Sequence, residues 1–344
     1  MLLYGLNDDR QLVTLLEPTN VQWNSKYYEC GDFSVQIPFE QYNSDIRYLY
    51  RVDRKNLGIV QKVSYTYQNN VKYVQMSGYM FEKILDNYIV PALYNVSGNI
   101  DDVVQVMLQR FVEPYLKGDN LPMLYYNHYT SSISISYNSV GSSYEVGKCL
   151  YSILQPYNMT YKFNYDFAND RLDFMLYKGV NRTSLQTENS YITFSTAFGN
   201  INNIEAISDN SNYKNCFDVQ VINDNSVVYS KSYDFSGGSR KYRLGVIYTD
   251  TYTDELPATI SQRILELATK YQNIFNLEAN PILGFYTYGV DYEIGDECDI
   301  IISDINLSYS GRVIAVYEVY KENTCELSIE IGDKIPTMLM KARL

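Results

Sequence analysis

The sequence predicts an α+β protein that is rich in β-structure, because strand patterns dominate and only a few helical patterns interrupt them. Four segments alternate apolar and polar residues on both sides of a short polar turn, which is typical of antiparallel hairpins. Three longer segments repeat apolar residues with helical spacing. With 344 residues, 46% of them hydrophobic, the chain can form one large domain or two to three smaller ones.

Each predicted hairpin contains Asn, Asp or Glu at its turn, and Asn and Asp tolerate the backbone conformations that tight turns require. Four such hairpins together indicate an antiparallel sheet. The hairpins are residues 57–79 around Asn69-Asn70, 158–177 around Ala168-Asn169-Asp170, 216–233 around Asp224-Asn225, and 312–332 around Glu322-Asn323.

The first predicted helix runs from about 100 to 116, and Asn99 is its expected N-cap. Apolar residues fall on one stripe of this helix, and we expect Val104, Leu108 and Phe111 to lie in the core. A truncation of a buried aromatic side chain leaves a cavity, so Phe111→Ala should destabilise the protein by roughly 3–5 kcal/mol.

Two further helices and one short helix are predicted. The second helix opens with Ser142-x-x-Glu145, a capping-box pattern, and ends before Pro156. The third covers about 256–277, and a short helix is possible near 80–87. The buried stripes are Val146, Cys149, Leu150, Ile153 and Leu154 in the second helix, and Ile260, Ile264, Leu267, Ala268, Tyr271 and Phe275 in the third.

The order of these elements suggests three domains. Clusters of Asn, Gly and Ser near 95–99 and 181–190 are the best candidates for boundaries. We therefore expect an N-terminal β domain over 1–92, an α+β middle domain over 93–188, and a second β domain with a long helix over 189–344. The run Ser236-Gly237-Gly238-Ser239 is expected to form a mobile loop tip.

Tyrosine is strongly enriched, with 37 Tyr against 13 Phe and 1 Trp. Tyrosine suits half-buried strands and protein interfaces, although the codon bias of an AT-rich genome explains the same enrichment and is the preferred interpretation. The formal net charge of −12 disfavours sequence-specific nucleic-acid binding, because an acidic surface repels phosphate. It is compatible with a pore wall along which nucleic acid slides.

The five cysteines are odd in number and widely spaced, so we expect reduced thiols rather than disulfides or a zinc site. The N-terminus has no signal-peptide pattern, and no run approaches 18 apolar residues. We therefore expect no membrane anchor.

The sequence contains no pattern that predicts catalysis. The single histidine, His128, has no accompanying nucleophile, and we expect it to be structural or exposed. Nucleotide-binding, nucleophile-elbow and zinc-protease motifs are absent, so we predict no catalytic residue, no cofactor and no metal.

The densest acidic segment, from Asp291 to Asp299, leaves a carboxylate pair or a calcium site open as alternatives. We favour a solvated strand face with a turn at Gly295-Asp296, because the spacing matches no calcium loop. This strand would place Asp291, Glu293, Glu297 and Asp299 on one face. The stretch from Asp166 to Asp170 is interpreted as a hairpin turn.

Two blocks of sequence resemble the tail-hub family of long-tailed bacteriophages and related phage-tail-like particles. The first block covers residues 23–38 and the second covers 286–300. Weaker similarities lie between and after them, so the resemblance spans about residues 2 to 333. The positions that carry the motif are Tyr28, Gly31, Asp32 and Phe33 in the first block, and Tyr288, Gly289, Asp291, Gly295 and Asp296 in the second.

These motif positions also have a structural interpretation. Gly31-Asp32 and Gly295-Asp296 are turn pairs between apolar strands, and Gly289 should supply a positive φ or a close backbone approach. None of them requires a catalytic role.

The resemblance implies a non-enzymatic structural protein with two hub-type antiparallel β-barrel domains and helix-containing inserted segments. It implies a homotrimeric ring at the tail tip of the virion, made in the cytoplasm of the infected bacterium. The ring would close the tail tube, adapt six-fold to three-fold symmetry, and take part in host attachment and genome ejection. Its implied partners are a tail tube or distal tail protein, a tape-measure protein and a spike or fibre protein.

Two other functions remain open from the sequence. A carbohydrate- or receptor-binding tail protein could use the aromatic side chains of Tyr125, Tyr126 and Tyr129 as a stacking platform. A cell-wall hydrolase could use an acid pair between Asp291 and Asp299.

Overall fold

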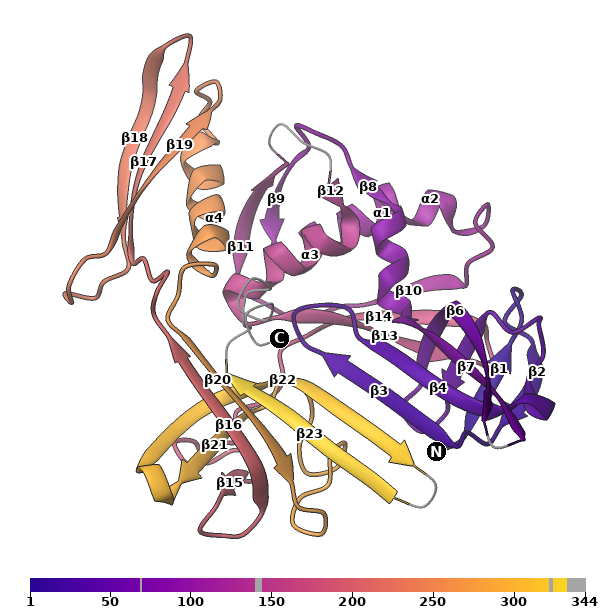
Figure 1. Cartoon of the computed structure of the whole chain (residues 1–344). Coiled ribbons are helices and arrows are strands. Elements are labelled where there is room, and N and C mark those ends of the chain that lie inside the picture. The colour runs from indigo at the N-terminus through magenta and orange to yellow at the C-terminus, as the bar shows by residue number, and fades with distance from the viewer. Residues whose placement is uncertain (69, 140–143, 322–323, 333–344) are drawn as a thin grey trace.

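The computed structural model describes residues 1–68, 70–139, 144–321 and 324–332 (Figure 1). Its main feature is one large, mostly antiparallel sheet whose strands come from both ends of the chain. The strands run in the order β16-β20-β23-β22-β3-β4-β7-β6-β5-β1-β2, with β21 and β15 attached beside β22. This confirms a β-rich α+β protein, while the pairings within the described residues form an open path rather than a closed barrel.

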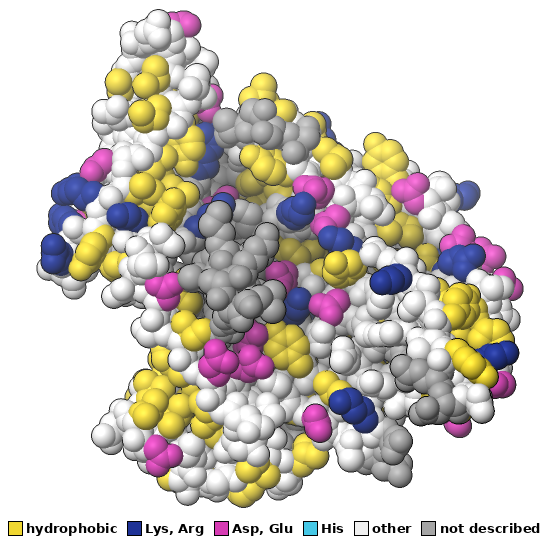
Figure 2. All heavy atoms as spheres, in the orientation of Figure 1, with side chains coloured by type: hydrophobic (Ala, Val, Ile, Leu, Met, Phe, Trp, Pro, Cys, Tyr) yellow, Lys and Arg dark blue, Asp and Glu magenta, His cyan; other side chains and the backbone are white. Residues whose placement is uncertain are grey.

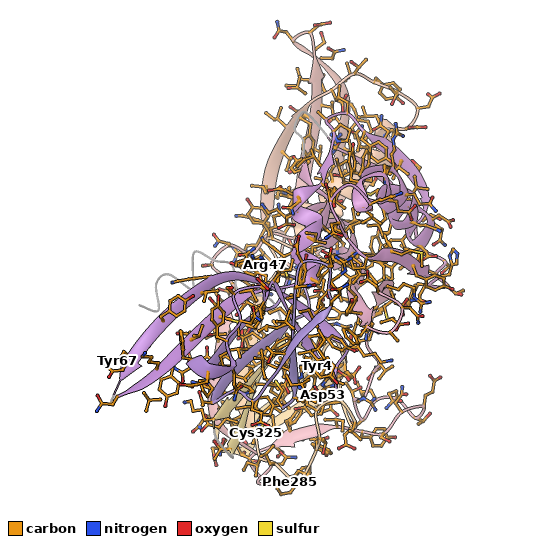
Figure 3. All side chains as sticks on the ribbon, turned by 90° about the vertical axis from the view of Figure 1, so that its right-hand side faces the viewer. Tyr4, Arg47, Asp53, Tyr67, Phe285 and Cys325 are labelled. Atoms are coloured by element: carbon orange, nitrogen blue, oxygen red, sulfur yellow. The ribbon has the colours of Figure 1, made fainter. Side chains whose placement is uncertain are left out.

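The N-terminal half of this sheet, with the strand order β3-β4-β7-β6-β5-β1-β2, packs around Trp23, Phe33 and neighbouring apolar side chains. Its long β6–β7 hairpin confirms the first predicted hairpin, and Tyr67 projects into solvent near the end of that hairpin (Figure 3). Asn69 of the predicted turn lies outside the described residues. The strands are β1 Leu3–Leu6, β2 Leu12–Leu16, β3 Asn20–Lys26, β4 Asp32–Pro38, β5 Tyr48–Arg51, β6 Asn56–Gln68 and β7 Val71–Met80, with the 3-10 turn η1 Phe39–Gln41.

The middle of the chain packs helices against small sheets. The predicted short helix near 80–87 is a 3-10 helix, η2 Phe81–Asn87. The predicted 158–177 hairpin is confirmed as β13–β14. The other elements are β8 Ile89–Val90, β9 Asn95–Asn99, α1 Ile100–Phe111, α2 Glu113–Leu116, β10 Met123–Asn127, β11 Ser134–Asn138, β12 Tyr144–Glu145, α3 Val146–Leu154, η3 Gln155–Tyr157, β13 Thr160–Asp166 and β14 Arg171–Tyr177.

The C-terminal half contributes β15 Thr193–Ser195, β16 Ile201–Asp209, β20 Ile274–Pro281, β21 Glu297–Ile302, η4 Ser303–Ile305, β22 Leu307–Lys321 and β23 Thr324–Gly332. Its core is a separate cluster that includes Phe194, Leu277 and Ile329. The strands of the last predicted hairpin are confirmed as β22 and β23, and its turn at Glu322-Asn323 lies outside the described residues.

Between β16 and β20 the chain forms a projecting unit, residues 210–273, which we call the arm (Figure 1). It consists of β17 Cys216–Asn223, β18 Ser226–Asp234, β19 Arg243–Thr249 and α4 Leu256–Ala268. The β17–β18 pair confirms the third hairpin, with positive φ at Asp224 and Asn225. Helix α4 packs its apolar side chains on Phe217, Val219 and Val221, so the arm has a core of its own.

Polar contacts hold the arm against the middle of the chain. The Tyr157 hydroxyl donates a hydrogen bond to the Gln262 side chain at 2.8 Å, and the Ser152 hydroxyl donates to Glu266 at 3.1 Å. This contact between helix α4 and the middle elements is therefore more polar than either core.

Two predicted helices have the wrong bounds. The third helix ends at Ala268 rather than near 277, because residues from Ile274 onward pair with β16 and β23, and Phe275 therefore lies in a strand. The second helix begins at Val146, after Glu145. Glu145 precedes the helix and makes no side-chain cap, so the capping-box prediction is wrong at this position, and Ser142 lies outside the described residues.

Helix α1 confirms its predicted N-cap, because the Asn99 side chain accepts a hydrogen bond from the Asp101 amide. Val104 and Leu108 are fully buried as predicted, but Phe111 is only partly buried and packs edge-on against Tyr94. The expected cost of 3–5 kcal/mol for Phe111→Ala is therefore too high, since truncation of a partly exposed ring leaves no closed cavity.

Leu108→Ala should instead cost about 2–5 kcal/mol, and Phe111→Ala clearly less, when unfolding is measured with denaturant. The exposed neighbour Val106 provides a control on the same helix, because Val106→Ala removes little buried surface. Equal losses for Leu108→Ala and Phe111→Ala would contradict this placement of α1.

Candidate functional site at the junction of the two sequence blocks

Strand β3, which overlaps the first sequence block, pairs with strand β22, which follows the second block in the chain. The two blocks themselves meet beside this pairing, where Gly295 lies against the Tyr27 ring, and we call this region the junction. Trp23 of β3 lies opposite Glu318 of β22 in this ladder. The ladder continues into the loops, because the Tyr27 amide donates to the Ile314 carbonyl at 2.8 Å. The pairing joins the N-terminal and C-terminal halves into one sheet.

Gly295 occupies the centre of this junction. Its φ is +93°, and a β-carbon there would overlap the Tyr27 ring and lie 2.9 Å from the Tyr177 ring. The Gly295 carbonyl accepts a hydrogen bond from the Arg312 guanidinium, and the Tyr177 hydroxyl donates to the Ile294 carbonyl at 2.6 Å. Both the positive φ and the lack of room for a β-carbon therefore require glycine at position 295.

Asp296 lies at the predicted Gly295-Asp296 turn but is buried, with 2% of its surface exposed. The predicted solvated strand face is wrong, because strand β21 begins only at Glu297, after Asp291 and Glu293, and Asp299 is buried.

The Asp296 carboxylate accepts hydrogen bonds from the Val180 amide at 2.8 Å, the Glu293 amide at 3.0 Å and the Arg182 guanidinium at 2.6 Å. These three hydrogen bonds replace the water that an exposed carboxylate would bind. The hydrogen bonds from Val180 and Arg182 to Asp296 thus link the segment after β14 to the second block.

The other acids of this segment are divided between several partners. Glu297 pairs with Arg312, and the Asp299 carboxylate accepts from the Ser310 hydroxyl at 2.5 Å and the Ser184 amide at 2.7 Å. Burial alone would raise the pKa of Asp299, but these hydrogen bonds outweigh it and lower the pKa. Within the described residues, no group of three His, Cys, Asp or Glu side chains could hold a metal ion.

Gly289 makes room for Arg54, which lies between β5 and β6, after the first block. Its φ is +87°, as its predicted role requires, and any β-carbon would overlap the Arg54 guanidinium. Arg54 lies over the Tyr288 ring at 4.2 Å and donates to the Tyr288 carbonyl at 2.9 Å. It also pairs with Glu293 at 3.0 Å, while Asp291 accepts from the Thr287 amide at 2.7 Å.

Most contacts of the first-block motif residues lie within the block itself, and Tyr28 is an exception. Asp32 accepts from the Asn24 side chain at 2.6 Å and pairs with Lys26 at 3.0 Å. Phe33 stacks on Trp23, with ring centroids 5.4 Å apart. Gly31 lies against the Asn24 carbonyl, and the Tyr28 hydroxyl donates to the Asn158 side chain at 3.3 Å.

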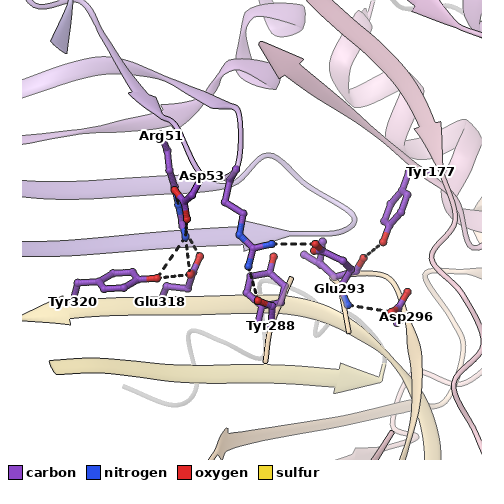
Figure 4. A network of polar contacts seen from close by, with 10 residues as sticks. Arg51, Asp53, Tyr177, Tyr288, Glu293, Asp296, Glu318 and Tyr320 are labelled. Atoms are coloured by element: carbon purple, nitrogen blue, oxygen red, sulfur yellow. Dashed lines mark hydrogen bonds and ion pairs between the residues drawn. The ribbon is translucent and has the colours of Figure 1, made fainter. Parts of the chain in front are cut away.

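A buried ion cluster beside this junction was not predicted (Figure 4). Arg51 at the end of β5 donates to both carboxylate oxygens of Glu318, at 2.6 and 3.0 Å, and to both oxygens of Asp53, at 2.9 and 3.0 Å. Arg51 is 1% and Glu318 is 4% exposed. Burial lowers the pKa of Arg51, but the two carboxylates outweigh it and raise the pKa, so the guanidinium stays charged.

A cleft of about 140 Å³ opens between the junction and the middle of the chain. Both signs of charge line it, together with several tyrosine rings. Glu82 accepts a hydrogen bond from the Phe163 amide at 3.1 Å, and burial raises the pKa of its carboxyl. Burial also lowers the pKa of Lys162, whose ammonium lies 4.2 Å from the Tyr177 ring centroid. Other lining residues include Lys26, Tyr27, Arg54, Tyr161, Tyr288 and Glu293.

Glu82→Gln should stabilise the protein at pH 8, and the gain should shrink as the pH falls toward the ordinary carboxyl pKa. The folded protein holds the Glu82 proton more tightly than the unfolded chain does, so wild-type stability decreases as the pH rises through that interval. Melting temperatures measured from pH 4 to 8 test this. Glu145→Gln should show the opposite sign, because Lys148 lowers the pKa of Glu145.

His128 and the tyrosines of the predicted stacking platform lie in the middle of the chain, in or just after strand β10. His128 is exposed and its Nδ1 lies 3.2 Å from the Asp101 carboxylate. Tyr125 is exposed, but Tyr126 stacks on Phe174 at 5.4 Å and its hydroxyl donates to Asp101 at 2.7 Å. The predicted tyrosine trio therefore does not form one exposed platform.

The cysteines were expected to be reduced core residues, but Cys30 and Cys325 are only partly buried. All five, which lie within the described ranges, are free thiols. Cys149, Cys216 and Cys298 are buried, and burial raises the pKa of the Cys298 thiol, which leaves it protonated. None of the helices in the described part of the chain is long and apolar enough to cross a bilayer.

A protein-family model matches this chain. The family model described as Siphovirus ReqiPepy6 Gp37-like protein matches residues 6–226, which is more than half of the chain. The chain belongs to this family. No curated protein matches the sequence of this Gp37-like chain.

Solved structures of phage tail proteins share the fold of the Gp37-like chain at low sequence identity. Prophage tail protein gp18 from Listeria monocytogenes EGD-e has a TM-score of 0.63 and 13% identity, covering 99% of this chain and 98% of gp18. The 43 kDa tail protein of prophage MuSo2 from Shewanella oneidensis has a TM-score of 0.59 and 10% identity, covering 96% and 97%. A tail protein from Neisseria meningitidis MC58 has a TM-score of 0.58 and 10% identity, covering 92% and 93%.

Proposed function

We propose that this Gp37-like chain is a structural subunit of the phage tail tip that assembles into a ring of three copies. The ring closes the distal end of the tail tube and adapts six-fold symmetry to a three-fold spike or fibre. Membership of a siphovirus family and a fold shared with phage tail proteins support a place in the virion tail.

The observation that carries the proposal is the β3–β22 pairing, which joins two β units of one chain into a single sheet. A ring of three such copies would present six β units to the tube and three repeats to the structure below it. The acids of the second block take part in ion pairs and backbone contacts, and this is consistent with a structural rather than catalytic use of that segment.

The proposal includes three domains, 1–92, 93–188 and 189–344, of which the first and third are hub-type β domains. Separate apolar clusters in the two halves of the large sheet support the separation of the first and third domains, while a further cluster contains residues from both sides of the proposed boundary at 92–93. The arm is an insertion in the third domain. The partners are a distal tail or tail tube protein, a tape-measure protein and a spike or fibre protein.

Native mass spectrometry of the purified chain, alone and mixed with the distal tail protein encoded beside it, tests the proposal. We expect a species with three copies in at least one of the two samples. A chain that stays single in both samples, or forms rings of another number, would remove the three-copy ring.

A further inference from the structure

A groove of about 540 Å³ lies where the arm, the middle of the chain and the first sequence block meet, and it adjoins the smaller cleft beside the junction. Lys270 after α4, Lys148 of α3 and the stretch from Tyr28 to Cys30 contribute to its wall. Figure 2 shows dark blue and magenta side chains close together in the central part of the face that it draws. We call this space the arm groove, and its size is typical of a binding cleft.

Two carboxyl groups that line the arm groove make no ion pair within the described residues. Glu82 accepts a hydrogen bond from the Phe163 amide at 3.1 Å, and Glu266 accepts from the Ser152 hydroxyl and the Gln262 side chain, both at 3.1 Å. Burial raises the pKa of both carboxyl groups. A cation supplied by an occupant would stabilise their charged forms.

Most of the lysines that line the groove already pair with other carboxylates. The pairs are Lys26–Asp32 at 3.0 Å, Lys83–Asp86 at 2.8 Å and Lys148–Glu145 at 2.6 Å. Lys270 is exposed. The groove therefore favours a positively charged occupant that can reach its buried carboxyl groups.

The large sheet brings the end of β23 close to this groove. Strand β22 is antiparallel to both β3 and β23, so β3 and β23 run in the same direction, and their arrowheads point toward the base of the arm in Figure 1. Ile331 of β23 pairs with Val313, and the carbonyl of the next residue, Ile314, accepts from the Tyr27 amide. Since neighbouring strands lie about 4.8 Å apart, the end of β23 is about 10 Å from Tyr27, which immediately precedes the groove wall at Tyr28.

Residues 333–344 follow β23 in the sequence as DKIPTMLMKARL and lie outside the described residues. They contain three cations, Lys334, Lys341 and Arg343, against one acid, so their charge is opposite in sign to the net charge of −12. A segment of this length can span up to about 40 Å, which is enough to cross the groove. Its methionines can adapt to irregular apolar surfaces, which the rings of Tyr151 and Tyr161 provide in the groove wall.

We infer that residues 333–344 dock in the arm groove of their own copy, with their cations toward Glu82 and Glu266. An occupant of this groove contacts the arm, α3 and the first block at once. It therefore braces the arm, whose hydrogen bonds to the middle of the chain come from Ser152 and Tyr157. A separate chain is a poorer occupant, because a covalently tethered segment has an effective concentration of about millimolar beside its site.

Disulfide formation in the full chain tests this inference. The variant Met338→Cys/Lys270→Cys places one thiol in the segment and one on the groove wall, whereas Met338→Cys/Lys117→Cys places the second thiol at an exposed lysine that does not line the groove. The groove pair should oxidise about tenfold faster or more, because docking raises the local concentration of the two thiols. Peptide mapping by mass spectrometry distinguishes the new bond from bonds to the five native cysteines.

Charge reversal in the segment tests the role of the two acids. Lys341→Glu/Arg343→Glu should slow oxidation of the groove pair several-fold, because repulsion from Glu82 and Glu266 replaces attraction. The control Lys117→Glu/Lys178→Glu changes the net charge equally at exposed lysines outside the groove, and it should leave the rate nearly unchanged.

Three results would overturn the inference. Equal oxidation rates for the two thiol pairs would show that the segment does not dock in the groove. A charge-reversed segment that oxidises as fast as the original would show that Glu82 and Glu266 do not hold it. Disulfides that join two chains, seen as dimers on a non-reducing gel, would assign the segment to a neighbouring copy. Each of these results leaves the proposed three-copy ring untouched, because the docking occurs within one chain.

Discussion

Replacement of Arg51 by Met should lower the free energy of unfolding by about 3–5 kcal/mol, because it leaves the buried Glu318 carboxylate without its cation. Arg51 and Glu318 are 267 positions apart and link the two halves of the large sheet. The loss should appear as a lower denaturant midpoint with an unchanged slope.

Two further variants identify the source of that loss. The double variant Arg51→Met/Glu318→Leu removes both charges and should recover much of the stability, because apolar side chains can replace a buried ion pair. Arg243→Met breaks an exposed pair with Asp218 and should change stability by less than about 1 kcal/mol. A loss for Arg51→Met no larger than that for Arg243→Met would contradict the buried ion cluster.

Gly295→Ala should cost about 3–5 kcal/mol, because two independent penalties act at this position. A positive φ strains an L-residue by about 1–3 kcal/mol, and the added methyl group overlaps the Tyr27 ring, which overpacks the junction at a similar cost. Since Tyr27 is buried with its hydroxyl on the Asn158 and Tyr177 carbonyls, the ring has no free space to move into.

Gly284→Ala is the matched control for this prediction. Gly284 has a φ of +99°, close to that of Gly295, but nothing lies within 4 Å of a β-carbon there. It should show the conformational cost alone, and the difference between the two variants gives the steric cost of the junction. Equal losses measured by denaturant unfolding would show that Gly295 is not packed as described.

Local patterns predicted the elements whose stability is local. The Asp224-Asn225 turn and the Asn99 cap act within a few residues, so their sequence signals were sufficient. Residues 274–281 continued a helical pattern into Phe275, but pairing with β16 and β23 made them a strand, which is a tertiary effect that a helical period cannot reveal.

At the junction, too, local sequence patterns could not reveal contacts between segments far apart in the chain. The sequence predicted a positive φ or a close backbone approach at Gly289, yet nothing in it indicated that Arg54, 235 positions earlier, fills the space beside this glycine. The acidic pattern around Asp296 resembled a solvated face because its partners, Val180 and Arg182, lie in a distant segment. Whether such a charged residue is buried or exposed depends on partners that only the fold brings beside it.

In the proposed ring, each of three copies supplies two β units that are joined through β3 and β22. Electron cryomicroscopy of the assembled tail tip measures this directly. We expect three copies around the axis, each with an unbroken β3–β22 ladder, so that six β units surround the opening. Six copies in the ring, or a ladder in which β3 pairs with β22 of a different copy, would contradict it.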